Sequence, residues 1–201
     1  MKVLNNRPGP EEIATIKQVF NAVPVLGNDF FEEMLPKWSA IDVKRKQVLS
    51  AEGDTERYLY IVTKGIQRCF CTHGGKEATT IFSYPVSFTG VVDSFLLQRP
   101  STLTFESLTQ SRLLRIHYKD FISLTEKHPE FEKWLRIMLS NVLAAVLERQ
   151  KELSIFSASE KLEVLFKRSP HVFNLIPDKY IASYIGVDKA TLSKMLNNKK
   201  L

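Results

Sequence analysis

The pattern of hydrophobic and polar positions divides the chain into three regions. Residues 11–39 mix short helical patterns with helix breakers. Between residues 46 and 117, short runs rich in β-branched and aromatic residues alternate with turn signals such as Lys64-Gly65. Closely spaced runs of this kind predict a jelly-roll-like antiparallel β-roll, here with flanking helices. After Tyr118 the hydrophobic period becomes helical.

A single long helix is predicted to begin at His128-Pro129, because proline is tolerated in the first turn of a helix. Five apolar residues follow a 4-3-4-3 spacing and three more widen the stripe: Phe131, Leu135, Met138, Val142 and Ala145, then Leu139, Val146 and Leu153. A heptad-like seam of about three heptads favours self-association. We therefore expect a homodimer through residues 128–153. The alternative is one long core helix packed against the roll.

The last part of the chain predicts two short helices joined by a tight turn. In "IASYIGVDKATLSKML" (residues 181–196), Gly186 stands where the chain must turn sharply, and glycine adopts positive φ without strain. We expect helices over Asp178–Tyr184 and Asp188–Leu196, each capped by its aspartate. A small residue, a glycine and inward-facing aliphatic residues at this spacing are typical of a helix-turn-helix.

The second helix of this pair leaves polar side chains off its buried face. Hydroxyls and lysines there suit contacts to phosphates and base edges in the major groove of DNA. The candidate DNA-binding residues are Lys189, Ala190, Thr191, Ser193, Lys194 and Asn197. Charge agrees with a polyanion partner: in residues 157–201, eight Lys/Arg minus four Asp/Glu give +4 of the chain's +6. The alternative is a structural hairpin with a solvated polar face.

Composition argues against several other classes of protein. The two cysteines, Cys69 and Cys71, provide neither a disulfide framework nor enough metal ligands. No signal peptide or run of roughly 20 apolar residues is visible, so we expect a cytoplasmic protein without a membrane partner. A cupin-like metal enzyme needs a His-x-His pair, whereas the four histidines are scattered, although any of them could ligate a haem iron. We expect no enzyme, no catalytic residues, no metal and no cofactor.

These features together resemble the Crp–Fnr transcription regulators, in their short form, over nearly the whole chain. The stretch "YLYIVTKGIQRCF" is similar to that family's roll motif, with its turn glycine at Gly65, and "SFTGVVDSFLLQRPST" occupies the position of the phosphate-binding cassette. The resemblance implies an α+β fold in three parts. A cyclic-nucleotide-binding-like sensor roll would cover residues 1–127, a dimerisation helix 128–154, and a winged-helix-like helix-turn-helix domain 155–201.

The resemblance also implies the partners. Double-stranded DNA would meet Lys189, Ala190 and Lys194 at base-reading positions, with Thr191 and Ser193 as support or phosphate contacts. RNA polymerase would be a further partner. The alternative is a ligand-binding or interaction module whose helix-turn-helix no longer reads DNA, and salt-sensitive DNA binding separates the two.

The effector pocket that the resemblance implies departs from the family's pattern. Gly90 is kept, but Val91 replaces the glutamate that takes the ribose 2′-hydroxyl. Ser101 stands where an arginine should meet the cyclic phosphate, and Arg99 comes two residues too early. Losing one charge-assisted contact costs on the order of 1.5–3 kcal/mol.

The long helix departs as well, because the nucleobase positions fall at Val146 and Leu147, which have no polar side-chain group. With these departures in one pocket, we expect cyclic AMP to bind weakly or not at all. Arg99, Ser101 and Thr102 leave an unknown small anion as the alternative effector.

Overall fold

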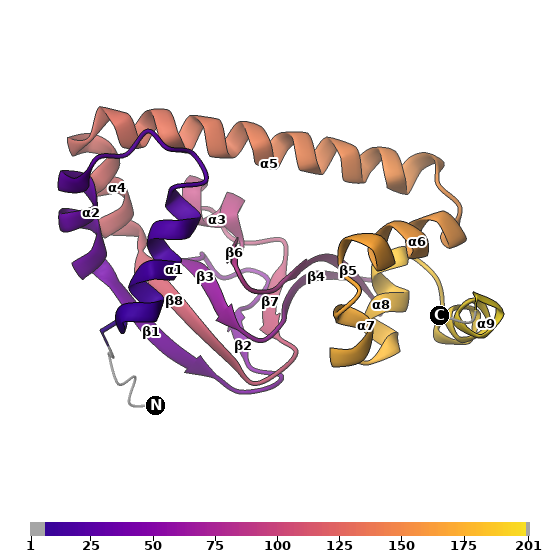
Figure 1. The fold of residues 1–201 in the computed structure, drawn as a ribbon. Coiled ribbons are helices and arrows are strands. Elements are labelled where there is room, and N and C mark those ends of the chain that lie inside the picture. The colour runs from indigo at the N-terminus through magenta and orange to yellow at the C-terminus, as the bar shows by residue number, and fades with distance from the viewer. Residues whose placement is uncertain (1–6, 200–201) are drawn as a thin grey trace.

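Two four-stranded antiparallel sheets form a β-roll in a computed structural model that describes residues 7–199 (Figure 1). The first sheet has the order β1 (Trp38–Val43), β8 (Ser111–His117), β3 (Tyr58–Lys64) and β6 (Ser87–Thr89). The second has the order β2 (Val48–Ser50), β7 (Thr104–Ser107), β4 (Gln67–His73) and β5 (Lys76–Ser83). Their inner faces share a hydrophobic cluster that includes Val62, Cys69, Phe105 and Leu113. The predicted antiparallel roll is confirmed.

Glycines allow the tight connections between consecutive strands. Gly65, between β3 and β4, has a φ of 92°, and an added Cβ there would collide with the side chain of Ser111. Gly74 and Gly75 close the β4–β5 hairpin with φ values of 57° and 75°. Positive φ at both central residues gives a turn whose twist matches that of the flanking strands.

Helices cover the outer face of the first sheet. They are α1 (Pro10–Phe20), α2 (Asn28–Met34), a 3-10 helix (Leu35–Lys37), α4 (Tyr118–Lys127) and the first turns of α5 (Pro129–Ile155). The rings of Phe20 and Trp134 stack with centroids 4.6 Å apart, and Trp134 Nε1 donates to Phe20 O at 2.8 Å. The start of α5 is thereby fixed to the roll.

The surroundings of α5 change along its length. Phe131 and Trp134 are buried in the core of the roll, and Leu135 and Met138 are half-buried against it. Every residue from 139 to 148 is exposed. One side of this segment carries five large apolar side chains, each between 38% and 60% exposed, which we call the exposed stripe: Leu139, Val142, Leu143, Val146 and Leu147. The predicted seam is therefore split, because its first half belongs to the roll.

Four helices follow α5 (Figure 1): α6 (Ala158–Arg168), α7 (Val172–Leu175), α8 (Asp178–Ile185) and α9 (Lys189–Lys199). Ser157 caps α6, and Glu160 completes a capping box with it. The hydrophobic cluster of these helices includes Ile66 and Leu108 of the roll. The C-terminal helices and the roll therefore share a core.

Two details expected of the C-terminal part are wrong. Residues 156–199 hold no strand, so the wing of a winged-helix domain is absent from this segment. The connections between its helices are two or three residues long, which is too short for a β-hairpin. Asp178 is the first residue of α8 rather than its cap, because Pro177 takes the extended N-cap position.

Among residues 7–199, no helix is long and apolar enough to cross a bilayer.

Candidate functional site

The turn between α8 and α9 follows from Gly186. This glycine has a φ of 80°, and the N–H groups of Gly186 and Val187 both donate to Ala182 O at 3.0 Å. The carboxylate of Asp188 then accepts from Thr191 N and Thr191 Oγ1, each at 2.8 Å. The bond from Thr191 N, with the hydroxyl bond second, holds the pKa of Asp188 below its ordinary range. The predicted turn and the second predicted cap are confirmed, and they set the direction of α9.

One face of α9 is polar and exposed. Five of the six candidate DNA-binding residues lie on it: Lys189, Ala190, Ser193, Lys194 and Asn197. Thr191 is half-buried, and its hydroxyl serves the cap. Leu192 is fully buried on the opposite face, against the C-terminal cluster. Neither Lys189 nor Lys194 forms an ion pair with any residue that the structure describes.

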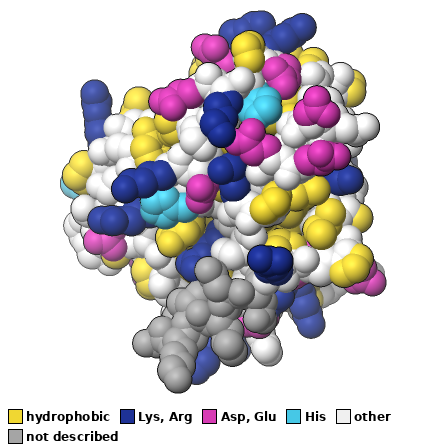
Figure 2. All heavy atoms as spheres, turned by 90° about the vertical axis from the view of Figure 1, so that its left-hand side faces the viewer, with side chains coloured by type: hydrophobic (Ala, Val, Ile, Leu, Met, Phe, Trp, Pro, Cys, Tyr) yellow, Lys and Arg dark blue, Asp and Glu magenta, His cyan; other side chains and the backbone are white. Residues whose placement is uncertain are grey.

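The other end of the molecule, formed by the N-terminal helices, carries mixed charges. Figure 2 shows basic and acidic side chains interspersed over it. Lys127 Nζ lies 2.8 Å and His128 Nε2 3.0 Å from the Glu33 carboxylate. Hydrogen bonds from Lys127 and then His128 lower the pKa of Glu33 to about 2. Charge is compensated at this end, in contrast to the two unpaired lysines of α9.

Ser183 of α8 holds the C-terminal helices on the roll. Thr79 N donates to Ser183 Oγ, and Ser183 Oγ donates to Glu77 O, each at 2.9 Å. Both partners belong to β5, an edge strand of the second sheet. An edge strand has unpaired backbone groups, and one serine here satisfies a donor and an acceptor.

A buried arginine supports the same contact. Arg68 of β4 lies between the rings of Phe70 and Tyr180, at 3.8 Å and 4.3 Å from their centroids. It also bonds the carboxylates of Glu77 and Glu106, each at 2.7 Å. Neither Arg68 nor Ser183 is among the residues predicted from the sequence. An arginine in the middle of a buried strand is the signal that could have found the first.

A second polar cluster ties the end of α5 to α6 and α8. Glu152 is 3% exposed and accepts from Arg149 at 2.7 Å and from Arg168 at 3.4 Å. Arg149 also donates to Tyr184 O at 2.7 Å, and Arg168 donates to Tyr184 Oη at 2.8 Å. The two arginines share one buried carboxylate, so the α5–α6 connection and α8 are held together.

Three of the candidate effector residues lie inside the roll. Gly90 follows β6 with a φ of 115°, and an added Cβ would lie 3.1 Å from the ring of Tyr60. Val91 is 1% exposed, in the same cluster as Tyr60. Ser101 is also buried, but its Oγ donates to Leu103 O at 2.6 Å. The interior beside Gly90 is filled by the protein's own side chains.

The other four candidate effector residues face solvent. Arg99 and Thr102 are exposed beyond α3 (Val92–Leu97). Val146 and Leu147 are 55% and 60% exposed, within the exposed stripe of α5. The structure therefore does not gather the seven predicted residues into one pocket.

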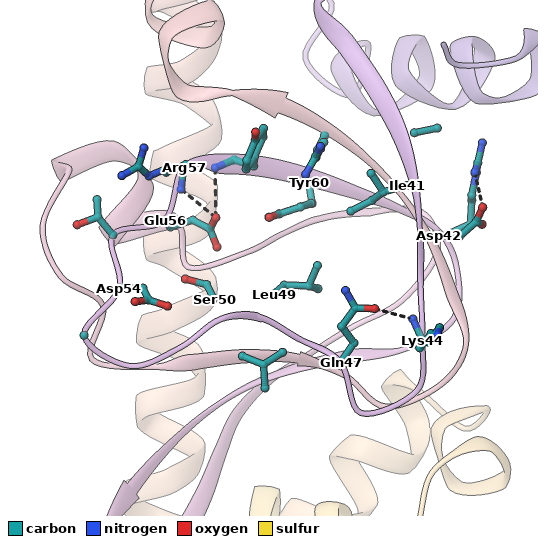
Figure 3. A pocket seen from close by; sticks show the side chains of 17 residues that line it. Ile41, Asp42, Lys44, Gln47, Leu49, Ser50, Asp54, Glu56, Arg57 and Tyr60 are labelled. Atoms are coloured by element: carbon teal, nitrogen blue, oxygen red, sulfur yellow. Dashed lines mark hydrogen bonds and ion pairs between the residues drawn. The ribbon is translucent and has the colours of Figure 1, made fainter. Parts of the chain in front are cut away.

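A cavity of about 820 Å³ opens elsewhere, at the mouth of the roll (Figure 3). None of the seven candidate effector residues lines it. Its walls come from β1, β2, β3 and β8 and from the β1–β2 and β2–β3 connections. Apolar and charged side chains both line it, among them Ile41, Leu49, Glu56, Tyr58, Tyr60 and Arg115.

Glu56 is the buried acid of this cavity and is 2% exposed. Its Oε1 accepts from Arg57 N at 3.0 Å and from Tyr58 N at 3.2 Å. Burial raises the pKa of this carboxyl to about 7, although nearby Tyr58, Arg57, Val91 and Tyr60 favour its ionised form. No described residue donates a hydrogen bond to its Oε2. Sequence reasoning missed Glu56, because an acid before a strand gives no sign of burial.

The histidines have separate structural contacts. Among residues 7–199 no group of three or more His, Cys, Asp and Glu side chains could hold a metal ion. His117 caps α4 by accepting from Lys119 N, and His171 packs on the ring of Tyr84 with centroids 4.5 Å apart.

Comparison with protein families matches residues 40–128 to the cyclic nucleotide-binding domain. The matched segment runs from β1 through α4 and so contains the roll. This segment is therefore similar to a cyclic nucleotide-binding domain. No curated protein matches the sequence of the chain.

Solved structures share the fold of this domain and of the helices after it. The Catabolite Activator Protein of Thermus thermophilus has a TM-score of 0.55 and 22% identity, covering 86% of this chain and 83% of that one. FixK2 of Bradyrhizobium japonicum has a TM-score of 0.69 and 14% identity, covering 80% and 83%. The c-di-GMP responsive global regulator CLP of Xanthomonas campestris has a TM-score of 0.64 and 15% identity, covering 87% and 92%. The resemblance to Crp–Fnr regulators is confirmed at the level of the fold.

Proposed function

We propose that this chain is a sequence-specific DNA-binding transcription regulator of Crp–Fnr type, in which α8 and α9 act as a helix-turn-helix. The observation that carries the proposal is the outward face of α9, where Lys189 and Lys194 are exposed and unpaired beyond a tight, capped turn. The major groove admits an α-helix, and lysines neutralise phosphates or bond guanine. The fold shared with DNA-binding regulators supports this role, which is regulatory rather than catalytic.

On DNA, the first turns of α9 would enter the groove. Lys189, Ala190 and Lys194 would face base edges, since the N-terminal residues of a recognition helix make these contacts. Ser193 and Asn197 would bond phosphates from the same face. Thr191 would support α9 through its bonds to Asp188. In this account residues 155–201 are the DNA-binding domain, 128–154 the connecting helix and 1–127 the regulatory roll.

We infer that the protein acts as a homodimer through α5. The exposed stripe places five large apolar side chains in water along one side of this helix. Pairing the stripe with that of a second copy would remove this area from water, at roughly 25 cal/mol per Å² of apolar surface. Two copies of α9 would then read half-sites of a palindrome about 34–36 Å apart, and RNA polymerase would be a further partner.

Cyclic AMP is not expected to be the effector. Tyr60 and Val91 fill the interior beside Gly90, and the Ser101 hydroxyl is already bonded to Leu103 O. A cyclic nucleotide would have to displace buried apolar side chains and would find no arginine inside the roll at position 99 or 101. We expect any binding of cyclic AMP to be weaker than micromolar.

Selection from random DNA followed by fluorescence anisotropy tests the proposal. Lys189→Ala and Lys194→Ala each remove a proposed base contact, so each should weaken binding to the selected site by about 10-fold and relax the sequence preference at the contacted position. Lys119→Ala is the matched control, because Lys119 is exposed on α4 far from α9. If no site is selected, or both α9 variants bind like the wild type, the proposed DNA-reading face is wrong.

A further inference from the structure

The cavity at the mouth of the roll has the features of a binding site that differs from the family's cassette. We propose that it binds a small organic anion that also carries a hydroxyl or amino donor, with the anionic group on Arg115 and the donor on Glu56. The site uses none of the residues from Gly90 to Thr102. The proposal does not depend on DNA binding.

The first observation is the unsatisfied carboxylate of Glu56. This side chain is 98% buried, yet Oε2 receives no hydrogen bond from the described residues. In Figure 3 its carboxylate points into the space between Ser50, Leu49 and Tyr60. Buried polar atoms almost always have a partner in native proteins, and the exceptions call for an explanation. A ligand hydroxyl or amino group in the cavity would supply the missing donor.

The second observation is an unpaired arginine on another wall. The guanidinium of Arg115 packs over the ring of Tyr58 at 4.3 Å, and its Nε lies 3.4 Å from Ser39 Oγ. Among residues 7–199 no carboxylate lies within ion-pair distance of it. Arg112 on the same strand is already occupied, because it pairs with both Glu12 and Asp42.

Arg115 is also accessible from two sides. It lines the 820 Å³ cavity and a neighbouring one of about 340 Å³, whose walls include Lys37 and His117. A free planar guanidinium is suited to a carboxylate or phosphate, which it can hold with two parallel hydrogen bonds. Lys37 in the second cavity already pairs with Asp120 at 3.8 Å, so the free guanidinium of Arg115 is the group that makes this wall favourable for the anionic end of a ligand.

Apolar walls separate these two polar ends. Ile41, Leu49, Tyr58 and Tyr60 line the space, and they suit the carbon body of a molecule. Small-molecule sites typically measure about 300–1,000 Å³ and combine apolar walls with a few converging polar groups. The cavity lies within this range of volume, and its apolar walls are combined with charged groups of both signs, among them Glu56 and Arg115.

Two pairs of probes test the proposal, since within each pair only the donor differs: malate against succinate, and 3-hydroxybenzoate against benzoate. Ribose 5-phosphate and cyclic AMP extend the test to phosphates. Binding to the full chain is measured by thermal shift and calorimetry without DNA. We expect saturable binding of at least one donor-bearing anion, about 10-fold tighter than its donor-free analogue.

Variants then assign the binding to the two residues. Arg115→Ala should weaken the binding of the selected probe by about 10-fold or more. Glu56→Gln should remove the preference for the donor, because its amide presents N–H groups where Oε2 accepted. Arg99→Ala is the control in the family's cassette and should leave binding unchanged. Arg115→Lys keeps the positive charge but lacks the planar guanidinium that can form two parallel hydrogen bonds. A melting curve measured without probe shows whether a loss of binding comes from this change or from misfolding.

Three results would overturn the proposal. They are no binding of any probe at millimolar concentration, binding that Arg115→Ala and Glu56→Gln leave unchanged, and binding that Arg99→Ala abolishes instead. Failure of the DNA-binding proposal would be recorded separately, in the anisotropy of Lys189→Ala and Lys194→Ala, and would leave these results untouched.

Discussion

The outward face of α9 and the interior of the roll beside Gly90 differ in one decisive respect. Both occupy positions where the resemblance to Crp–Fnr regulators places function. On α9 the polar side chains are exposed, and Lys189 and Lys194 have no ion-pair partner among the described residues. Beside Gly90, Tyr60 and Val91 fill the space themselves. A site can bind a partner only if the protein's own side chains do not already fill it. The spacing of residues in the sequence does not show whether a site is filled.

Restoring the family's glutamate is the strongest test of the closed interior. Val91→Glu should destabilise the protein by about 3–5 kcal/mol, because it buries an unpaired carboxylate. It should not create tight cyclic AMP binding. Chemical denaturation and calorimetry measure the two effects. Arg99→Glu, a change at an exposed position, should alter stability by less than about 0.5 kcal/mol. A well-folded Val91→Glu protein that binds cyclic AMP would falsify the claim that this interior is filled.

Glu56 provides the next largest effect, through pH. Its folded pKa is about 7 against an ordinary value of 4.5, so the folded state holds the proton more tightly than the unfolded state. The wild type should therefore lose stability as pH rises from 4.5 to 7, by about 3 kcal/mol in total at 1.36 kcal/mol per pKa unit. Glu56→Gln should remove this loss. Urea denaturation at pH 5 and pH 8 measures the difference.

Glu160 is the matched control for this pH effect, because the Ser157 cap lowers its pKa. Relative to the wild type, Glu160→Gln should lose stability at the higher pH, which is the opposite of the change expected for Glu56→Gln. If Glu56→Gln behaves like Glu160→Gln, then Glu56 is not a buried carboxylate that lacks a partner.

DNA reading by α9 as proposed requires the proposed homodimer through α5. Leu143→Glu combined with Leu147→Glu places two charges in the exposed stripe. We expect a monomer whose affinity for a palindromic site falls by about 100-fold, or about 2.7 kcal/mol. Sedimentation velocity and anisotropy measure the two effects. Asn141→Glu, on the opposite side of α5, should stay dimeric. A Leu143→Glu/Leu147→Glu protein that remains a dimer would exclude this stripe as the interface.

Local signals in the sequence predicted much of this structure. Gly186, Asp188 and the Ser157-Glu160 box act through bonds to their near neighbours in the chain, so the pattern reveals them. The β-roll was predictable because β-branched and aromatic runs alternate with turn residues. The same local reasoning failed at Asp178, where Pro177 takes the cap position.

Contacts between distant segments were beyond this reasoning. Ser183 meets β5 across more than a hundred residues, and Arg68 reaches Tyr180 of α8. The division of the α5 seam depends on where the roll ends beneath the helix. Glu56 lies in the connection before β3, and Arg115 lies in β8. The cavity that both residues line exists only in the folded chain. A single sequence contains no record of such pairings.

The most direct test of the central comparison measures both regions at once. Anisotropy titrations of the wild-type protein on its selected operator, at one salt concentration, are run with and without about 1 mM cyclic AMP. An open reading face and a filled interior predict specific binding without the nucleotide, with dissociation constants that agree within about 2-fold. No specific binding, or binding that cyclic AMP tightens by about 10-fold or more, would contradict the account.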